Sequence, residues 1–177
     1  MAARTDASGE PILLMDQNRA RWDRLQIRRG QLALARAREL GGAGGFYALQ
    51  AAIAACHAAA GTPDATDWNR IAALYGDLAA LLDSPVIELN RAVAIGMAEG
   101  PLAALAIVDS LADEPVLKSY HLLPSVRGDL LHRLSRFAEA HAAFEAAAAL
   151  AGNSREREFL KRRAAIAARA AQDHGCR

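Results

Sequence analysis

The sequence predicts an all-α protein of about eight helices arranged as antiparallel hairpins, and three observations predict it. Hydrophobic residues make up 53% of the 177-residue chain while aromatic residues make up only 5%, because alanine, the best helix former, is so abundant. Glycines that end helices and prolines that begin them recur at short intervals. No segment shows the alternating, β-branched pattern of a strand.

Three helices are expected in the N-terminal half, after a flexible segment at residues 1–12. Asp16–Trp22 has the pattern of a short helical or turn segment, and Asp23 can cap a helix that reaches about Leu40, where Gly41-Gly42 ends it. The second helix is expected from Phe46 to about Ala60. Its apolar stripe consists of Phe46, Leu49, Ile53 and Cys56.

The third helix is expected to be long and amphipathic, with Thr66 or Asp67 as its cap. Its predicted buried face recurs at steps of three and four residues and consists of Trp68, Ile71, Tyr75, Leu78 and Leu82. Ser84-Pro85 then marks the next helix start, with proline in the first turn, where its missing N–H costs nothing.

Five further helices complete the prediction. The fourth runs from Pro85 to about Ala98, the fifth from Pro101 to about Ala112, and the sixth from Val116 to Leu134 with an interruption near Pro124. Ser135 can cap the seventh, which has an apolar stripe of Phe137, Ala140, Phe144 and Ala147. Asn153 and Glu156 have capping-box spacing for the last helix, which is expected to end near Ala170 before a flexible tail at residues 171–177.

The helix pairs repeat at the spacing of a known architecture. Ala104 and Ala140 lie 36 residues apart, close to the period of about 34 residues in tetratricopeptide (TPR) repeats. Gly128 and Phe144 stand where a small residue of one helix meets a bulky residue of its partner, and Ala92 and Val108 hold the same places in the preceding unit. Residues 13–170 are therefore predicted to be one TPR-like domain, with an ordinary bundle of alanine-rich hairpins as the alternative.

Composition excludes several classes of function and location. The formal net charge is +1, which gives no overall field to attract nucleic acid or anionic lipid. Cys56 and Cys176 form no disulfide framework. The N-terminus lacks the apolar core of a signal peptide, and no later stretch has the roughly 20 apolar residues of a membrane helix. We therefore expect a cytoplasmic protein without a membrane partner.

One N-terminal segment concentrates groups suited to recognition. Acids, amides, guanidiniums and an indole, which make charge-assisted hydrogen bonds and stacking contacts, crowd together in Asp16, Gln17, Asn18, Arg19, Arg21, Trp22 and Asp23. They are predicted to bind a partner, or alternatively to attach the first helix to the rest of the domain. Seven arginines lie between Arg19 and Arg38, which suits an acidic partner or nucleic acid, or else a solvated face partnered by nearby acids.

A second cluster of polar residues lies in the predicted repeats. It consists of Asn90, Arg91, Tyr120, His121 and Arg127, which either line a groove or satisfy one another as a structural network. No histidine pairing or Cys-x-x-Cys spacing indicates a metal site, and no nucleophile or phosphate-loop motif indicates an enzyme. We expect no cofactor and no catalytic activity.

Several ordered motifs resemble a known family. They are Leu14-Met15-Asp16-Gln17-Asn18-Arg19-Ala20-Arg21-Trp22-Asp23, Ala48-Leu49-Gln50-Ala51-Ala52-Ile53-Ala54-Ala55, Thr66-Asp67-Trp68, Ser84 through Ala94, Tyr120-His121-Leu122-Leu123, and Asn153 with Glu156-Arg157 and Phe159-Leu160. Together they resemble the TPR-like C-terminal extension of a group of bacterial extracytoplasmic-function (ECF) sigma factors.

The resemblance implies a regulatory role in transcription initiation through contacts with sigma-factor core regions and RNA polymerase. Promoter DNA is expected to be contacted only through sigma regions, which nothing in this chain resembles. The group's Asp-Gln-Asp-Arg signature falls on Asp16, Gln17, Asn18 and Arg19, and Asn18 departs from it by losing a negative charge while keeping an acceptor. Two other functions stay open: a stand-alone adaptor that holds a peptide or small protein in its concave face, and a small-molecule sensor near Asn90, Tyr120 and His121.

Overall fold

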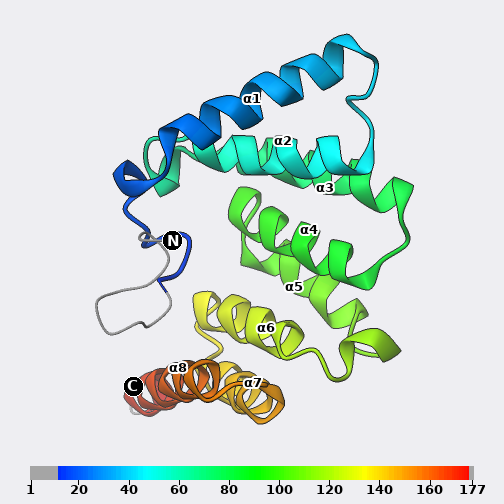
Figure 1. The fold of residues 1–177 in the computed structure, drawn as a ribbon. Coiled ribbons are helices and arrows are strands. Elements are labelled where there is room, and N and C mark those ends of the chain that lie inside the picture. Colours follow the sequence, from blue (N-terminus) through cyan, green and yellow to red (C-terminus); the bar gives the residue numbers. More distant parts are fainter. Residues whose placement is uncertain (1–11, 176–177) are drawn as a thin grey trace. The chain divides into compact units, whose positions relative to one another are not determined.

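The computed structural model describes residues 12–175, and in this range it contains eight α-helices, three short 3₁₀ turns and no strand (Figure 1). Consecutive helices from α1 to α3, and again from α4 to α8, pack against each other as hairpins. The predicted all-α helical-hairpin repeat fold is therefore confirmed. The predicted flexible segment at residues 1–12 lies, apart from Ile12, outside the described residues.

The chain divides between Leu82 and Asp83 into two compact units. The first contains the 3₁₀ turns η1 (Arg19–Arg21) and η2 (Pro63–Ala65) and the helices α1 (Arg24–Glu39), α2 (Phe46–Ala59) and α3 (Trp68–Leu81). The second contains η3 (Pro115–Leu117) and the helices α4 (Pro85–Ala98), α5 (Pro101–Ser110), α6 (Leu122–Arg133), α7 (Phe137–Leu150) and α8 (Ser154–Gly175). The sequence prediction treated residues 13–170 as one domain, and nothing in the composition of the short α3–α4 connection marks this division.

The core of the first unit lies mainly between α2 and α3. Leu49 and Ile53 of α2 are buried, as are Ile71, Leu74 and Leu78 of α3. Asp67, one of the two caps predicted for α3, accepts a hydrogen bond from the N–H of Arg70. The predicted face of α3 is correct at its centre, but its last member, Leu82, is 48% exposed because α3 ends at Leu81.

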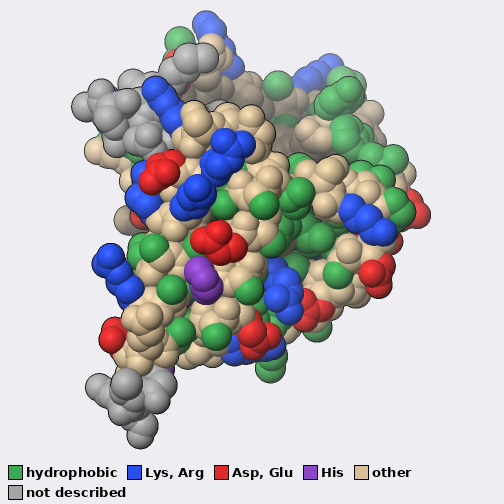
Figure 2. Space-filling view, turned by 90° about the horizontal axis from the view of Figure 1, so that it is seen from below, with side chains coloured by type: hydrophobic (Ala, Val, Ile, Leu, Met, Phe, Trp, Pro, Cys, Tyr) green, Lys and Arg blue, Asp and Glu red, His purple; other side chains and the backbone are tan. Residues whose placement is uncertain are grey.

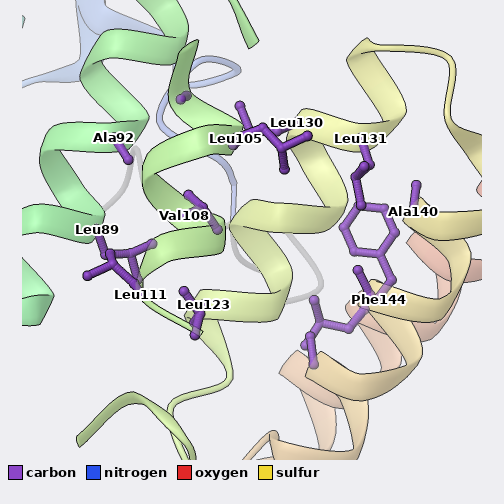
Figure 3. Packing of buried hydrophobic residues seen from close by; sticks show 14 of the residues in the cluster. Leu89, Ala92, Leu105, Val108, Leu111, Leu123, Leu130, Leu131, Ala140 and Phe144 are labelled. Atoms are coloured by element: carbon purple, nitrogen blue, oxygen red, sulfur yellow. The ribbon is translucent and has the colours of Figure 1, made fainter. Parts of the chain in front are cut away.

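The core of the second unit is larger and continuous across its helices (Figure 3). Leu89 and Ala92 of α4, Leu105 and Val108 of α5, Leu123, Leu130 and Leu131 of α6, and Ala140 and Phe144 of α7 all belong to it. From α8 it includes Leu160, Ala164 and Ala167. Alanine at many of these positions lets neighbouring helices approach closely.

The predicted helix crossing at Gly128 is present. A Cβ added to Gly128 would lie 2.8 Å from the ring of Phe144, which is fully buried. A second close approach joins Gly96 of α4 to Ala104 of α5, where an added Cβ would lie 3.0 Å from the Ala104 Cβ. Glycine is thus required at Gly128 by contact between helices and not by backbone conformation.

Two predicted features around α6 are corrected. Pro124 does not interrupt a longer helix: α6 begins at Leu122, which places the proline in its first turn, where it needs no hydrogen-bond donor. Ser135 does not cap α7, since the N-cap residue is Arg136 and no side chain makes the cap hydrogen bond. Ser135 instead has a φ of 60°, in the left-handed turn between α6 and α7.

The last helix is longer than predicted. The sequence placed its end near Ala170 and a flexible tail at residues 171–177, but α8 continues to Gly175. The His174 ring lies 4.8 Å from the Phe137 ring of α7, centroid to centroid, so the last turn packs against the preceding helix. The capping prediction at its start is confirmed, because Asn153 Oδ1 accepts from the N–H of Glu156 at 2.8 Å.

None of the helices between residues 12 and 175 combines the length and apolar character that a membrane span requires.

The Gly128 crossing leads to the first testable prediction. Gly128→Ala places a methyl group against the buried Phe144 ring, and this overpacking should lower the free energy of unfolding by about 1–3 kcal/mol. Gly76→Ala in α3 is the matched control, because its added Cβ meets nothing within 4 Å and should raise stability by about 0.5–1 kcal/mol. Urea unfolding followed by circular dichroism measures both, and equal stability of the two variants would contradict the packing described here.

Candidate functional site

The predicted recognition segment, Asp16–Asp23, forms a turn, the 3₁₀ turn η1 and the start of α1. Asn18 caps η1, its Oδ1 accepting from the N–H of Ala20 at 3.0 Å, and Asp23 caps α1, its Oδ1 accepting from the N–H of Gln26 at 3.0 Å. The Gln17 side chain donates to the Ile12 carbonyl at 3.1 Å. Because the cap at residue 18 needs only an acceptor, asparagine serves there as aspartate does.

Arg19 is the structural centre of this segment. Its side chain is 5% exposed, and its guanidinium donates to the carbonyls of His57 and Ala60 at 2.9 and 3.0 Å and to Thr66 Oγ1 at 3.0 Å. The two carbonyls end α2, where the helix dipole leaves partial negative charge and backbone acceptors lack partners within the helix. The guanidinium therefore joins η1 to the end of α2 and to the loop before α3.

Arg19 thus attaches the N-terminal segment to the rest of the first unit, which is the alternative to partner binding given by the sequence. Its guanidinium carbon also lies 5.2 Å from the centroid of the Trp22 ring, which is half-buried, so the cation holds the indole in place. Asp16 and Arg21, in contrast, are exposed. Asn18 and Asp23 are exposed as well, but their side chains cap η1 and α1.

An open groove of about 820 Å³ lies beside this segment, between α1 and α2. Figure 1 shows α1 diverging from α2 within the first unit, and Leu34 is the only residue of α1 that is buried. The groove is lined by Leu14, Gln17, Arg21, Trp22 and Asp23 from the N-terminal segment, by Gln26, Ile27, Gly30 and Gln31 from α1, and by Ala51, Ala54, Ala55, His57 and Ala58 from α2. Four of the seven predicted partner-binding residues line it: Gln17, Arg21, Trp22 and Asp23. Asn18 and Arg19 hold this segment in position.

The floor of the groove was missed by the sequence prediction. Ala51, Ala54, Ala55 and Ala58 are spaced by three and four residues, so they share one face of α2. Their spacing was visible in the sequence, but alanine is frequent throughout the chain and this stripe looked like helix packing. Only the tertiary structure shows that α1 leaves it uncovered.

Arg21 lines the groove, and three further arginines follow it in the N-terminal part of α1. Among the described residues, Arg21, Arg24, Arg28 and Arg29 are exposed and make no ion pair. Arg36, farther along α1, pairs with Glu39 at 2.9 Å. The N-terminal part of α1 therefore carries uncompensated positive charge.

His57 lies in the groove wall at the end of α2. Burial lowers the pKa of its imidazole below the usual value, and the nearby Arg19 guanidinium lowers it further. Its ring packs edge-on against Trp68, with centroids 5.2 Å apart. The neutral imidazole is therefore the form that the fold stabilises.

The second predicted cluster is distributed over separate contacts in the second unit. Arg91 pairs with Glu88 at 2.8 Å, Arg127 with Asp109 at 2.7 Å, and His121 Nε2 lies 2.8 Å from Glu156 Oε1. The rings of Tyr120 and His121 contact each other, while Asn90 is exposed. Each charged member has a partner of its own, which favours the structural network over a shared groove.

The surface of the second unit is electrostatically mixed. On the face shown in Figure 2, basic and acidic side chains are interspersed. Arg136 pairs with Glu139 at 2.7 Å, and Arg163 pairs with Asp129 while its guanidinium carbon lies 4.6 Å from the Phe144 ring centroid.

Within residues 12–175, no group of three or more His, Cys, Asp or Glu side chains is arranged to hold a metal ion.

Arg19 provides the second testable prediction. Arg19→Ala leaves the acceptors at His57, Ala60 and Thr66 without their donor and should lower the stability of the first unit by about 2–4 kcal/mol. Both tryptophans, Trp22 and Trp68, lie in this unit, so urea unfolding followed by tryptophan fluorescence reports on it directly. Arg21→Ala is the exposed control and should change stability by less than about 0.5 kcal/mol; similar losses in both variants would show that the Arg19 contacts contribute nothing.

The third prediction concerns pH. Because the pKa of His57 is lower in the folded protein than in the unfolded chain, the unfolded chain binds more protons between the two values. The stability of the first unit should therefore decrease as pH falls through about 6.5 toward the folded-state pKa of His57. Urea midpoints followed by tryptophan fluorescence should show this decrease, and His57→Gln should remove most of it; an unchanged pH slope in the variant would exclude His57 as its origin.

Comparison with known proteins gives two matches. A family of unknown function, DUF6596, matches residues 1–38, which contain the recognition segment and most of α1. An uncharacterized protein of Rhizobium meliloti (strain 1021) is 44% identical over 159 residues, covering 90% of this chain but 37% of that protein, so the chain spans little more than a third of this relative's length. No solved structure matches the chain.

Proposed function

We propose that this chain is the C-terminal helical-repeat extension of an ECF-type sigma factor and supports transcription initiation through protein contacts. The observation that carries the proposal is the groove of the first unit, because the segment resembling the sigma-factor extensions forms one of its walls. Leu14, Gln17, Arg21, Trp22 and Asp23 all line it. A helical-hairpin repeat domain with an open groove is suited to binding protein segments.

The length of the Rhizobium relative is compatible with this role. Since 159 residues are 37% of that protein, it is about 430 residues long and contains a large region outside the match. In the proposal, sigma regions occupy such a region and contact promoter DNA and core polymerase, while the domain described here contacts those sigma regions or the polymerase. No catalytic step is assigned to it.

A pull-down of the 177-residue chain against core RNA polymerase and against separately expressed sigma regions of its parent factor tests the proposal. Asp16→Ala/Arg21→Ala changes exposed members of the recognition segment and should reduce capture by about tenfold, a loss equivalent to about 1.4 kcal/mol of binding free energy. Arg19 is left intact because its removal should weaken the fold. Arg29→Ala is the matched control: Arg29 is exposed, makes no ion pair with the described part of the chain and is absent from the groove lining, so its removal should preserve capture.

Capture by neither bait would contradict the sigma-extension proposal and leave an adaptor that binds another protein. Equal loss with the segment variant and with Arg29→Ala would place the contact outside the recognition segment.

A further inference from the structure

The groove between α1 and α2 has a volume that can hold part of an α-helix. An α-helix with its side chains is about 10–12 Å across and rises 1.5 Å per residue, so each residue occupies roughly 120–170 Å³. The groove volume of about 820 Å³ corresponds to between one and two helical turns. It is open along one side, so a longer helix can lie in it with one face buried.

Its inner surface is largely apolar. The alanines of the α2 floor have no side chain beyond Cβ, and Ala51 and Ala54 are exposed in the absence of a partner. Leu14, Trp22 and Ile27 add larger apolar surface on the opposite wall, with Leu14 39% exposed. At Gly30 an added Cβ meets nothing within 4 Å, so the α1 wall leaves free space for a partner's side chains.

The positive charge beside the groove indicates which charge the partner carries. Arg21 lines the groove, and Arg24 and Arg28 directly follow the lining residues Asp23 and Ile27 on α1. These three arginines are exposed and have no ion pair among the described residues. Between residues 19 and 38 the chain contains seven arginines and a single acid, Asp23, whose carboxylate caps α1. A partner with acidic residues beside its apolar face matches this arrangement.

The same arginines suit nucleic-acid phosphates less well. Single-stranded nucleic acid is held by aromatic side chains on which bases stack. The groove lining contains two rings, the Trp22 indole and the His57 imidazole. The Trp22 ring is already half-buried and in contact with Arg19. An alanine floor offers nothing to a phosphate backbone.

We propose that the groove binds an amphipathic helix with a small apolar face and acidic flanks. This inference rests on the proposed function, in which the helix belongs to the sigma regions or to RNA polymerase, and it names the chemistry of the segment that is recognised. The apolar face covers the alanine floor, and the acidic flank lies against Arg21, Arg24 and Arg28.

Binding of designed peptides to the 177-residue chain tests the inference. The probes are a helical peptide with an alanine and leucine face and glutamates on its flanks, the same peptide with lysines in place of the glutamates, and a short DNA duplex. Trp22 emission in a Trp68→Phe background reports binding, since these are the two tryptophans of the chain. The acidic peptide should bind at least tenfold more tightly than the basic one, and its affinity should fall with added salt.

Two matched pairs of variants locate the site. Gly30→Leu fills the groove and should reduce binding of the acidic peptide about tenfold, while Ala33→Leu, an exposed position of the same helix that is absent from the lining, should not. Arg21→Glu should reduce binding by a similar factor, while Arg29→Glu should have a much smaller effect. Circular dichroism and urea unfolding of each variant confirm that the fold is retained.

Failure of this inference and failure of the proposed function are distinguishable. Capture of sigma regions or polymerase that is insensitive to Gly30→Leu would overturn the groove inference and leave the sigma-extension proposal standing. Groove-dependent binding of the acidic peptide without capture of either bait would support the groove inference and reject the sigma-factor partner. Tighter binding of the DNA duplex than of the acidic peptide, with loss in Arg21→Glu, would overturn the inference in favour of nucleic acid.

Discussion

The first unit depends on one buried guanidinium. Arg19 donates hydrogen bonds to two carbonyls at the end of α2 and to the Thr66 hydroxyl, and it holds the Trp22 indole beside it. A buried cation is costly unless its donors find partners, and the end of a helix supplies several acceptors together with a favourable dipole. This contact fixes the start of α1 and the loop before α3 at the same point.

The second unit uses arginine at helix ends in the same way. Arg133 donates to the Gly96 carbonyl in the last turn of α4 at 2.8 Å, and Arg157 donates to the Ala151 carbonyl at the end of α7 at 2.9 Å. In each case a cation from one helix satisfies backbone acceptors of another. The apolar contacts between helices determine how closely they pack, and these arginines fix where their ends lie.

The groove forms because only part of α1 packs against the rest of the first unit. The helix is held at its N-terminal end by the segment around Arg19 and contributes Leu34 to the core, but Gly30 and Gln31 leave a gap opposite the α2 alanines. In the second unit the equivalent contacts are closed, since Gly128 receives the Phe144 ring and alanines of α7 and α8 are fully buried. The unfilled space therefore occurs together with arginines that have no ion pair within residues 12–175, which is why this face is the candidate interaction site.

The sequence by itself determined the helical architecture, because helix propensity, caps and apolar periodicity act over a few residues. The Asp23, Asp67 and Asn153 caps and the Gly128–Phe144 crossing were all predicted from spacing. The Ser135 cap, the interruption at Pro124 and the end of α8 were wrong, because a left-handed turn, the start of α6 and the contact of His174 with Phe137 depend on how α6, α7 and α8 meet. The sequence also marked Asp16–Asp23 as unusual, but only tertiary structure separated buried Arg19 from exposed Arg21, since which of them reaches the end of α2 depends on contacts made 38 to 47 residues away along the chain.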